Sequence, residues 1–322
     1  MYKYGTNSVI NRYLRVLREQ IILQNHIIYF ILNNAFLFTV SCQLATQDVV
    51  FHLFTKRNPS ESIPVIATVN SISTAVHFSV TSRTVFTIHN YGESMESNFN
   101  AFVVNAYLAA DEDINVFAVD WSKGSSLYTV GLANAQAAGQ AIASFINILK
   151  SNFGYGTNNV KIVGLGLGGH VAGIAAREAV DTVPHIVALD PSFYGWTHHP
   201  DKLKSTDADV VEVLHTTAGI MGYDYPLGTV DFYANNGAAQ PGCGSDSVCS
   251  YQYSYVFYAE SISAVTNDGD QFIGTKCEDY EEAREQQCDG LRNVVFGGND
   301  DKTGVTGIYQ FYTNNSPPFA QN

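Results

Sequence analysis

Basic residues are scarce in this sequence. Its 322 residues include 17 Lys and Arg against 30 Asp and Glu, a formal net charge of −13. No basic tract occurs, which argues against a nucleic-acid partner and against electrostatic attachment to anionic lipid. Charged residues make up only 15%, while 26 Gly, 19 Tyr and 19 Phe are present. This composition excludes a disordered or coiled-coil chain and indicates a folded, turn-rich protein with one domain of roughly 250 to 280 residues.

Long hydrophobic runs are also missing. An apolar stretch at residues 27–40 has 14 residues, is interrupted by Asn33 and Asn34, and follows a front that carries four basic residues. It is too short to span a bilayer comfortably and fits the core of a signal peptide; the alternative is a buried strand or helix of the domain. We therefore expect an N-terminal extension and signal peptide at 1–42, a secreted domain at 43–322 and no stable membrane anchor.

Cysteines are few, and none belongs to a C-x-x-C pair. If Cys42 leaves with the signal peptide, four remain in the last third of the chain: Cys243, Cys249, Cys277 and Cys288. Pairing the first two and the last two would close two short loops in an oxidising compartment. Zinc binding is the competing interpretation, but the spacings of 6, 28 and 11 argue against it. A single acceptor triplet predicts N-glycosylation at Asn314.

Short apolar runs alternate with helical windows, without a proline-rich linker, a charge block or an internal repeat. The predicted strands are residues 49–54, 85–89, 114–120, 160–163, 185–190 and 210–215, and the predicted helices are residues 99–109, 132–149 and 170–180. This alternation indicates an α/β fold with a mostly parallel central sheet and helices on both faces. After Gly219 we expect long loops, edge strands and a last helix near residues 254–265, all packed on the same sheet.

A glycine-rich turn between a predicted strand and a predicted helix is the most informative motif. Gly164, Gly166 and Gly169 match G-x-G-x-x-G, and Asp190 follows 21 residues later. This arrangement formally satisfies the dinucleotide-binding fingerprint. Three observations weaken that interpretation: the motif follows several strands instead of the first one, His170 stands where a small or apolar residue is usual, and the chain is predicted to be secreted.

The same turn fits the frame of a nucleophile elbow, G-x-S-x-G, in which small flanking residues avoid clashes on a strained strand-to-helix turn. Gly166 stands at the serine position, between Gly164 and Gly168. Here the chain resembles the pancreatic lipase family, in particular short insect lipases and phospholipase A1-like members, whose elbow reads GHSLGAHVAG against GLGLGGHVAG in this chain. The resemblance covers about residues 48–318 and implies a single-domain α/β-hydrolase fold.

Other segments carry the same resemblance. They are FHLFTKRN at 51–58, HNY at 89–91 in place of the family's HGW or HGF, VDW at 119–121, LDP at 189–191, DAD with LHT at 207–216, DFYANNG at 231–237 and QPGC at 240–243. The order and spacing of these segments make the resemblance highly specific.

The resemblance implies a Ser–Asp–His triad, in which serine attacks an ester, histidine shuttles its proton and aspartate orients the imidazole. In this chain the nucleophile position holds Gly166, the acid position Asp190 and the histidine position Tyr251. Glycine has no side chain to attack with, and tyrosine, with a pKa of about 10, is a poor base at neutral pH. Losing the serine or the histidine costs on the order of 10⁶ in turnover, so we expect no ester hydrolysis. Yolk proteins of higher flies, which belong to the same family, also lack the serine.

No substitute catalytic group is expected. Ser192 lies on the loop of the acid, and His170 lies on the elbow helix where the family also has histidine, so both are predicted to pack or cap. We expect His198 and His199 on an exposed loop and His215 at a strand end, as surface or core residues.

The oxyanion donors are expected to survive, because the backbone N–H groups of Tyr91 and Leu167 need no particular side chain. Gly166 is expected to leave a larger apolar floor, so that an acyl chain or a sterol lies in the cleft without reacting. Only residues 244–248 separate the first two domain cysteines, where the family has its lid. By resemblance, a lid this short goes with phospholipase A1-type substrates.

The leading prediction is a secreted lipase-family protein without ester hydrolase activity, which binds lipid or another hydrophobic ligand or serves as a storage protein. It is expected to need no cofactor and no metal. One alternative is an active carboxylic ester hydrolase of phospholipase A1 or lipase type that uses an unrecognised nucleophile. The other is a dinucleotide-binding enzyme, which a titration with NADH would detect.

Overall fold

The computed structural model describes residues 43–110, 113–298 and 302–321. The expected signal peptide at 1–42 lies outside the described residues, so its assignment stays a prediction. Residues from Leu44 onward form one compact unit. Among the described residues, no helix has both the length and the apolar character that a membrane crossing requires.

An eleven-stranded sheet runs through this unit in the order β10-β9-β11-β8-β7-β6-β5-β3-β4-β1-β2. The strands are β1 (Val50–Phe54), β2 (Ile63–Val65), β3 (Arg83–Ile88), β4 (Ile114–Asp120), β5 (Val160–Leu165), β6 (His185–Leu189), β7 (Val210–His215), β8 (Val230–Ala234), β9 (Ile273–Cys277), β10 (Arg292–Val295) and β11 (Gly307–Phe311). The central run from β4 to β11 pairs in parallel, whereas β1, β2, β9 and β10 pair antiparallel at the two edges.

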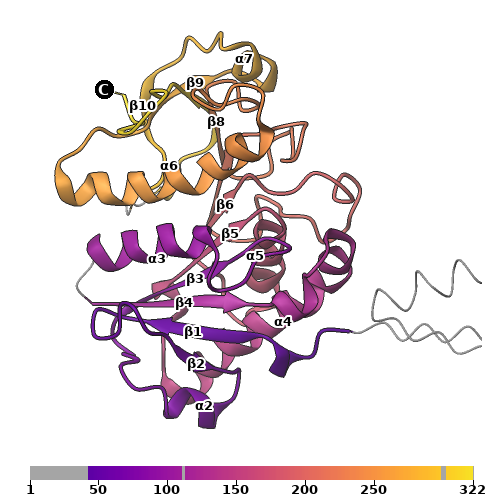
Figure 1. Cartoon of the computed structure of the whole chain (residues 1–322), viewed down its shortest axis with the longest axis vertical. Helices are drawn as coiled ribbons and strands as arrows, with labels where there is room; N and C mark the ends of the chain where they lie inside the picture. Colours follow the sequence, from indigo (N-terminus) through magenta and orange to yellow (C-terminus); the bar gives the residue numbers. More distant parts are fainter. Residues whose placement is uncertain (1–42, 111–112, 299–301, 322) are drawn as a thin grey trace, which may run out of the picture. The chain divides into compact units, whose positions relative to one another are not determined.

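Helices cover both faces of the sheet. They are α2 (Val69–Ser73), α3 (Asn98–Ala110), α4 (Tyr128–Phe153), α5 (Leu167–Glu178), α6 (Ser247–Asn267) and α7 (Tyr280–Glu285), with short 3₁₀ helices at Thr46–Asp48, Ser122–Gly124 and Thr157–Asn159. Helix α3 packs along α6, and α4 packs along α5 (Figure 1). The predicted α/β class, with a mostly parallel sheet between two helical layers, is confirmed.

The central strands are apolar throughout because both of their faces are buried. Successive side chains point to opposite faces, so Ile186 joins the core under α4 and α5 while Val187 joins the core under α3 and α6. Every residue of β6 and β7 is buried. This double burial explains why short apolar runs located these strands in the sequence.

The prediction was least accurate after Gly219. Strand β8 lies in the interior of the sheet between β7 and β11, where loops and edge strands were expected. Helix α6 begins seven residues before the predicted residue 254, because the Asp246 carboxylate accepts hydrogen bonds from the N–H groups of Val248 and Cys249 and caps it. This helix is also not the last one, since α7 follows it.

Two disulfides join the cysteines as predicted. Cys243 pairs with Cys249 across the first turn of α6, and Cys277 pairs with Cys288 across α7. The described part of the chain contains no cluster of three or more His, Cys, Asp or Glu side chains suited to a metal ion.

Candidate functional site

The chain turns sharply between β5 and α5, at Gly166. This residue has φ 56° and ψ −114°, a conformation that L side chains rarely adopt and that costs free energy at a non-glycine residue. Two residues later the helix passes so close to β3 that a Cβ at Gly168 would overlap the carbonyl oxygen of Ile88. The strand, the strained turn and the tightly packed helix together have the geometry of a nucleophile elbow.

The space where a nucleophile would stand is filled. A Cβ built on Gly166 would lie 2.6 Å from Cγ and Oδ1 of Asn90 and would overlap the hydroxyl oxygen of Tyr251. Real Cβ atoms essentially never approach other atoms this closely. The expected larger apolar floor is therefore wrong, because two polar side chains from distant segments occupy the volume that the missing side chain released.

The Asn90 side chain also accepts a hydrogen bond from one of the expected oxyanion donors. The N–H of Leu167 donates a buried hydrogen bond of 3.0 Å to Oδ1 of Asn90. Leu167 is the first residue of α5, so its N–H has no partner within the helix and depends on another group. The predicted donor is thus present, but the side-chain amide oxygen of Asn90 accepts its hydrogen bond. Tyr91, the other expected donor, is partly exposed beside Asn90.

Asp190, the retained acid, is fully buried and hydrogen-bonded away from Tyr251. Its Oδ1 accepts from the N–H groups of Thr216 at 2.8 Å and Thr217 at 2.9 Å, and its Oδ2 accepts from the Thr217 hydroxyl. Burial raises the pKa of the Asp190 carboxyl, and these hydrogen bonds oppose the shift by favouring the charged form. Gly222 makes room for this arrangement, because a Cβ there would lie 2.6 Å from Cγ of Asp190.

Tyr251 reaches the elbow from α6. Its side chain is only 7% exposed, and within the described structure its hydroxyl has no hydrogen-bond partner. Burial raises its pKa well above the usual 10, and the nearby carboxylates of Glu93 and Asp190 raise it further. The phenol is therefore neutral at physiological pH and cannot act as the base that a histidine would supply.

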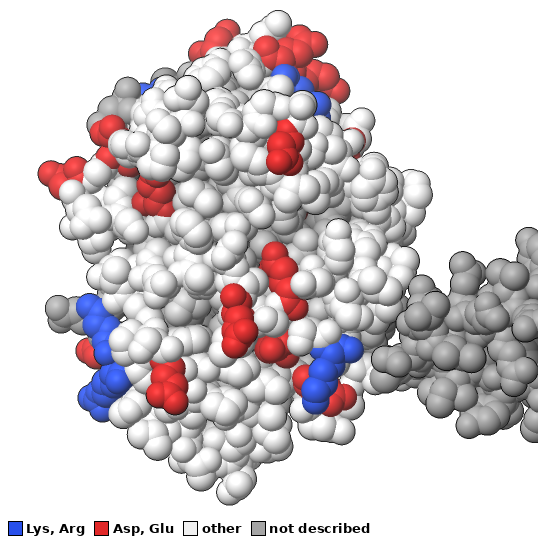
Figure 2. Space-filling view, in the orientation of Figure 1, with Lys and Arg blue, Asp and Glu red and all other residues white. Residues whose placement is uncertain are grey.

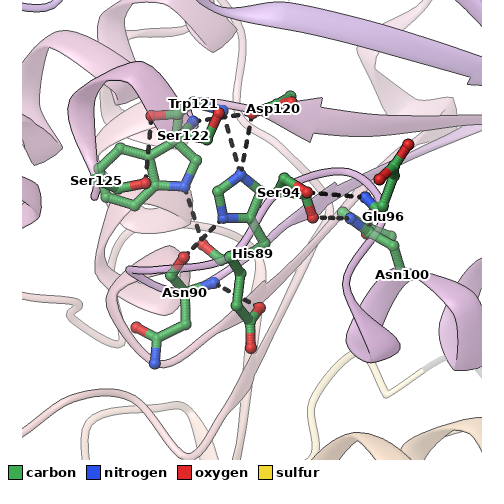
Figure 3. A network of polar contacts seen from close by, with 11 residues as sticks. His89, Asn90, Ser94, Glu96, Asn100, Asp120, Trp121, Ser122 and Ser125 are labelled. Carbon is green, nitrogen blue, oxygen red and sulfur yellow. Dashed lines mark hydrogen bonds and ion pairs between the residues drawn. The ribbon is translucent and has the colours of Figure 1, made fainter. Parts of the chain in front are cut away.

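Asn90 is held in place through His89, which the sequence analysis did not single out (Figure 3). Nδ1 of His89 lies 2.7 Å from the Asn90 carbonyl oxygen, and its Nε2 accepts from the N–H of Trp121 at 3.3 Å. The Trp121 indole in turn donates to the His89 carbonyl at 2.9 Å. Nε2 of His89 also lies 3.5 Å from Oδ1 of Asp120. The only sequence signal was the triplet His89-Asn90-Tyr91, which differs from the resembled family at its second residue.

The other histidines singled out in the sequence, and Ser192, have structural surroundings. His170 is fully buried, stacks on Trp196 at 3.9 Å, and bonds the Ser192 carbonyl and the Leu203 N–H. Burial lowers its pKa to about 3, so it is neutral. These contacts agree with a packing role.

His215 lies in the core, where it bonds the Asp231 carboxylate and the carbonyl of Tyr223. His198 is exposed, as predicted, but the predicted exposure of His199 is only partly met, because its ring packs on Trp196 at 4.5 Å.

Asn314 has an engaged side chain. Its Nδ2 donates to the carbonyls of Pro318 at 2.7 Å and Ala320 at 3.2 Å, and its Oδ1 accepts from Gln321. A glycan on Nδ2 would remove at least one of these donated bonds. N-glycosylation at this position stays a prediction.

The parallel sheet, the elbow after β5, the acid after β6 and the Tyr251 position on α6 define the architecture of an α/β hydrolase. The Lipase family model matches residues 32–297. The chain is 31% identical over 265 residues to pancreatic triacylglycerol lipase of Homo sapiens, across 74% of this chain and 56% of the human protein. It is 30% identical over 272 residues to inactive pancreatic lipase-related protein 1 of Canis lupus familiaris, with the same coverage.

The chain therefore belongs to the lipase family, within the pancreatic lipase group of α/β hydrolases. It spans little more than half the length of these curated relatives. Because the chain belongs to this family, Gly164, Gly166 and Gly169 form a hydrolase elbow and not a dinucleotide-binding turn.

Proposed function

We propose that this chain is a secreted lipase-family protein that does not hydrolyse esters and that binds lipid through an aromatic surface beside the former reacting centre. The observation that carries the first part is the filled elbow. Gly166 has no nucleophile, and Asn90 and Tyr251 occupy the volume where an ester carbon would meet one. The inactive dog relative supports the idea that this fold persists without catalysis.

The lipid-binding surface that we propose lies outside the filled site. We define the aromatic rim as Tyr91, Leu127, Tyr128, Phe193 and Tyr194. The ring centroids of Tyr91 and Tyr128 are 5.1 Å apart, the Tyr128 hydroxyl bonds the Tyr194 carbonyl, and the Phe193 and Tyr194 rings are 5.6 Å apart. The rim borders the elbow, because Asn90 precedes Tyr91 and because the N–H of Ser192 donates to the Gly166 carbonyl.

Three rim side chains are exposed to solvent. Tyr91, Leu127 and Tyr194 are 36%, 53% and 62% exposed. Amphipathic rings of this kind favour the boundary between water and an apolar phase, since the ring is apolar and the hydroxyl is hydrated. The rim thus presents exposed apolar side chains beside the filled elbow.

The net charge of the protein favours one kind of lipid surface over another. Acidic side chains are scattered over a mostly uncharged face and basic ones form only small groups (Figure 2). With a formal net charge of −13, the protein is repelled by anionic lipid. We therefore propose a zwitterionic or neutral lipid surface as the ligand. The two disulfides support secretion, because such bonds persist in oxidising compartments.

Flotation with phosphatidylcholine vesicles tests lipid binding. We expect the protein to float, and the double variant Leu127→Ser/Tyr194→Ser to lose binding by about tenfold, because two exposed apolar contacts are removed. Leu291→Ser/Tyr312→Ser is the matched control, since these side chains are 74% and 49% exposed and lie outside the rim. Equal loss in both double variants, or no flotation of the parent protein, refutes the binding proposal and leaves a storage role.

Hydrolysis is tested on the same preparation with phosphatidylcholine and p-nitrophenyl butyrate. We expect no turnover above the uncatalysed rate, because the chain has no nucleophile at the elbow. Turnover that Asp190→Ala abolishes would instead establish an active ester hydrolase.

A further inference from the structure

The Asn90 side chain has the chemistry of a bound ligand. Its Oδ1 is the carbonyl oxygen of an amide. This oxygen is buried and accepts a hydrogen bond of 3.0 Å from the N–H of Leu167. An ester substrate in an α/β hydrolase presents a carbonyl oxygen to the same backbone donor. The amide of Asn90 and the carbonyl group of an ester therefore compete for one N–H.

We propose that Asn90 is an internal occupant of the oxyanion site, which keeps this site closed independently of the missing nucleophile. This inference rests on the proposed function in one respect, namely that the elbow is the remnant of an ester-hydrolysing site. It adds that inactivity has two separate structural causes. One is the lack of a nucleophile at Gly166, and the other is the side chain at position 90.

The position of Asn90 is determined by its neighbours. His89 bonds the Asn90 carbonyl at 2.7 Å, and Oε2 of Glu93 accepts from the Asn90 N–H at 3.3 Å. With both backbone groups engaged and only 5% of the residue exposed, the side chain has few alternative orientations. It therefore acts as a permanent cap on the first N–H of α5 and does not behave as a mobile gate.

A direct consequence concerns attempts to restore activity. A serine at position 166 would place its Cβ 2.6 Å from Cγ and Oδ1 of Asn90, besides overlapping the Tyr251 hydroxyl. Replacing Gly166 by Ser and Tyr251 by His thus leaves the collision with Asn90 and leaves the Leu167 N–H occupied. Only the further replacement Asn90→Gly frees both the volume and the donor.

Hydrogen exchange of the Leu167 amide tests the occupancy without any reliance on activity. In Asn90→Ala we expect this amide to exchange at least about tenfold faster, because its buried acceptor is gone. Asn90→Asp is the matched control, since its carboxylate keeps an acceptor in place, and its Leu167 amide should exchange within about twofold of the parent. The amide of Ile162 in β5 reports whether global stability has changed. Unchanged Leu167 exchange in Asn90→Ala overturns the proposal.

The second arm compares p-nitrophenyl butyrate hydrolysis by two reconstructed variants. Gly166→Ser/Tyr251→His should hydrolyse the ester only at a rate close to the uncatalysed one, whereas the same pair with Asn90→Gly should be about 100-fold faster, the effect of regaining one oxyanion donor. A triple variant no faster than the double variant overturns the proposal. Turnover by the parent protein would refute the proposed lack of activity but would not alter the exchange result, so the two failures are distinguishable.

Discussion

Two buried polar groups differ in how well their atoms are paired: one is Tyr251 beside the elbow after β5, and the other is the pair formed by His215 of β7 and Asp231 of β8. After β5, Gly166 has φ 56°, and the adjacent Tyr251 hydroxyl has no partner in the described structure. At β7 and β8, His215 bonds the Asp231 carboxylate at 2.9 Å, and the N–H groups of Leu227 and Gly228 donate to the same carboxylate at 2.9 Å.

The first group has an unpartnered hydroxyl, whereas the second is a structural pair in which both side chains are hydrogen-bonded. The His215 ring also stacks on Tyr233 with its centroid 4.2 Å away, so both its polar atoms and its faces are in contact. A paired buried charge is costly to disturb, because removing one partner leaves the other buried without a partner. An unpaired neutral hydroxyl already costs free energy, so its removal should be tolerated or favourable.

The largest expected effect is at the paired group. Asp231→Ala should lower the free energy of unfolding by about 3 to 5 kcal/mol, because it leaves His215 and two backbone N–H groups without their acceptor. Denaturation in urea measures this loss. The exposed Glu285→Ala should stay within about 0.5 kcal/mol of the parent. A loss below about 1 kcal/mol for Asp231→Ala would remove the contrast between the two groups.

An intermediate effect depends on pH and concerns His170 beside the elbow. Burial lowers its folded pKa to about 3, below the unfolded value of about 6.5, so the unfolded chain binds more protons and stability falls as pH drops below 6.5. Between pH 7.5 and 5 this residue should account for a loss of about 2 kcal/mol. His170→Gln should be less stable at pH 7.5, but its free energy of unfolding should depend less steeply on pH. Parallel curves for the two proteins would contradict this assignment.

The smallest effect has the opposite sign. Tyr251→Phe removes the unpartnered hydroxyl while keeping the ring that fills the space at Gly166, so we expect it to raise the free energy of unfolding by about 1 kcal/mol. Tyr258→Phe is the matched control on the same helix, because the Tyr258 hydroxyl bonds Tyr107 at 2.6 Å, and its loss should destabilise. If both variants are destabilised alike, the hydroxyl of Tyr251 has a partner of its own.

Much of the fold followed from local patterns. Strands β1 and β3 to β7 could be located from their apolar runs, because these strands are buried on both faces or lie beside strands that are. Strand β8 was missed because its run contains Asp231, whose charge is tolerated only through partners from β7 and the preceding loop. The disulfide pairing was correct because short loops between neighbouring cysteines are local features.

The amino-acid sequence by itself determined the family and the elbow, since these depend on motifs and their order. It could not reveal that Asn90 and Tyr251 share the space beside Gly166, because they are 161 positions apart and meet only when β3 and α6 pack at the end of β5. Whether the elbow was empty or filled was decided by the tertiary structure alone. The physical reason is close packing: a side chain lost from a tightly packed turn leaves a volume that neighbours of the right size fill, and only the folded chain brings those neighbours together.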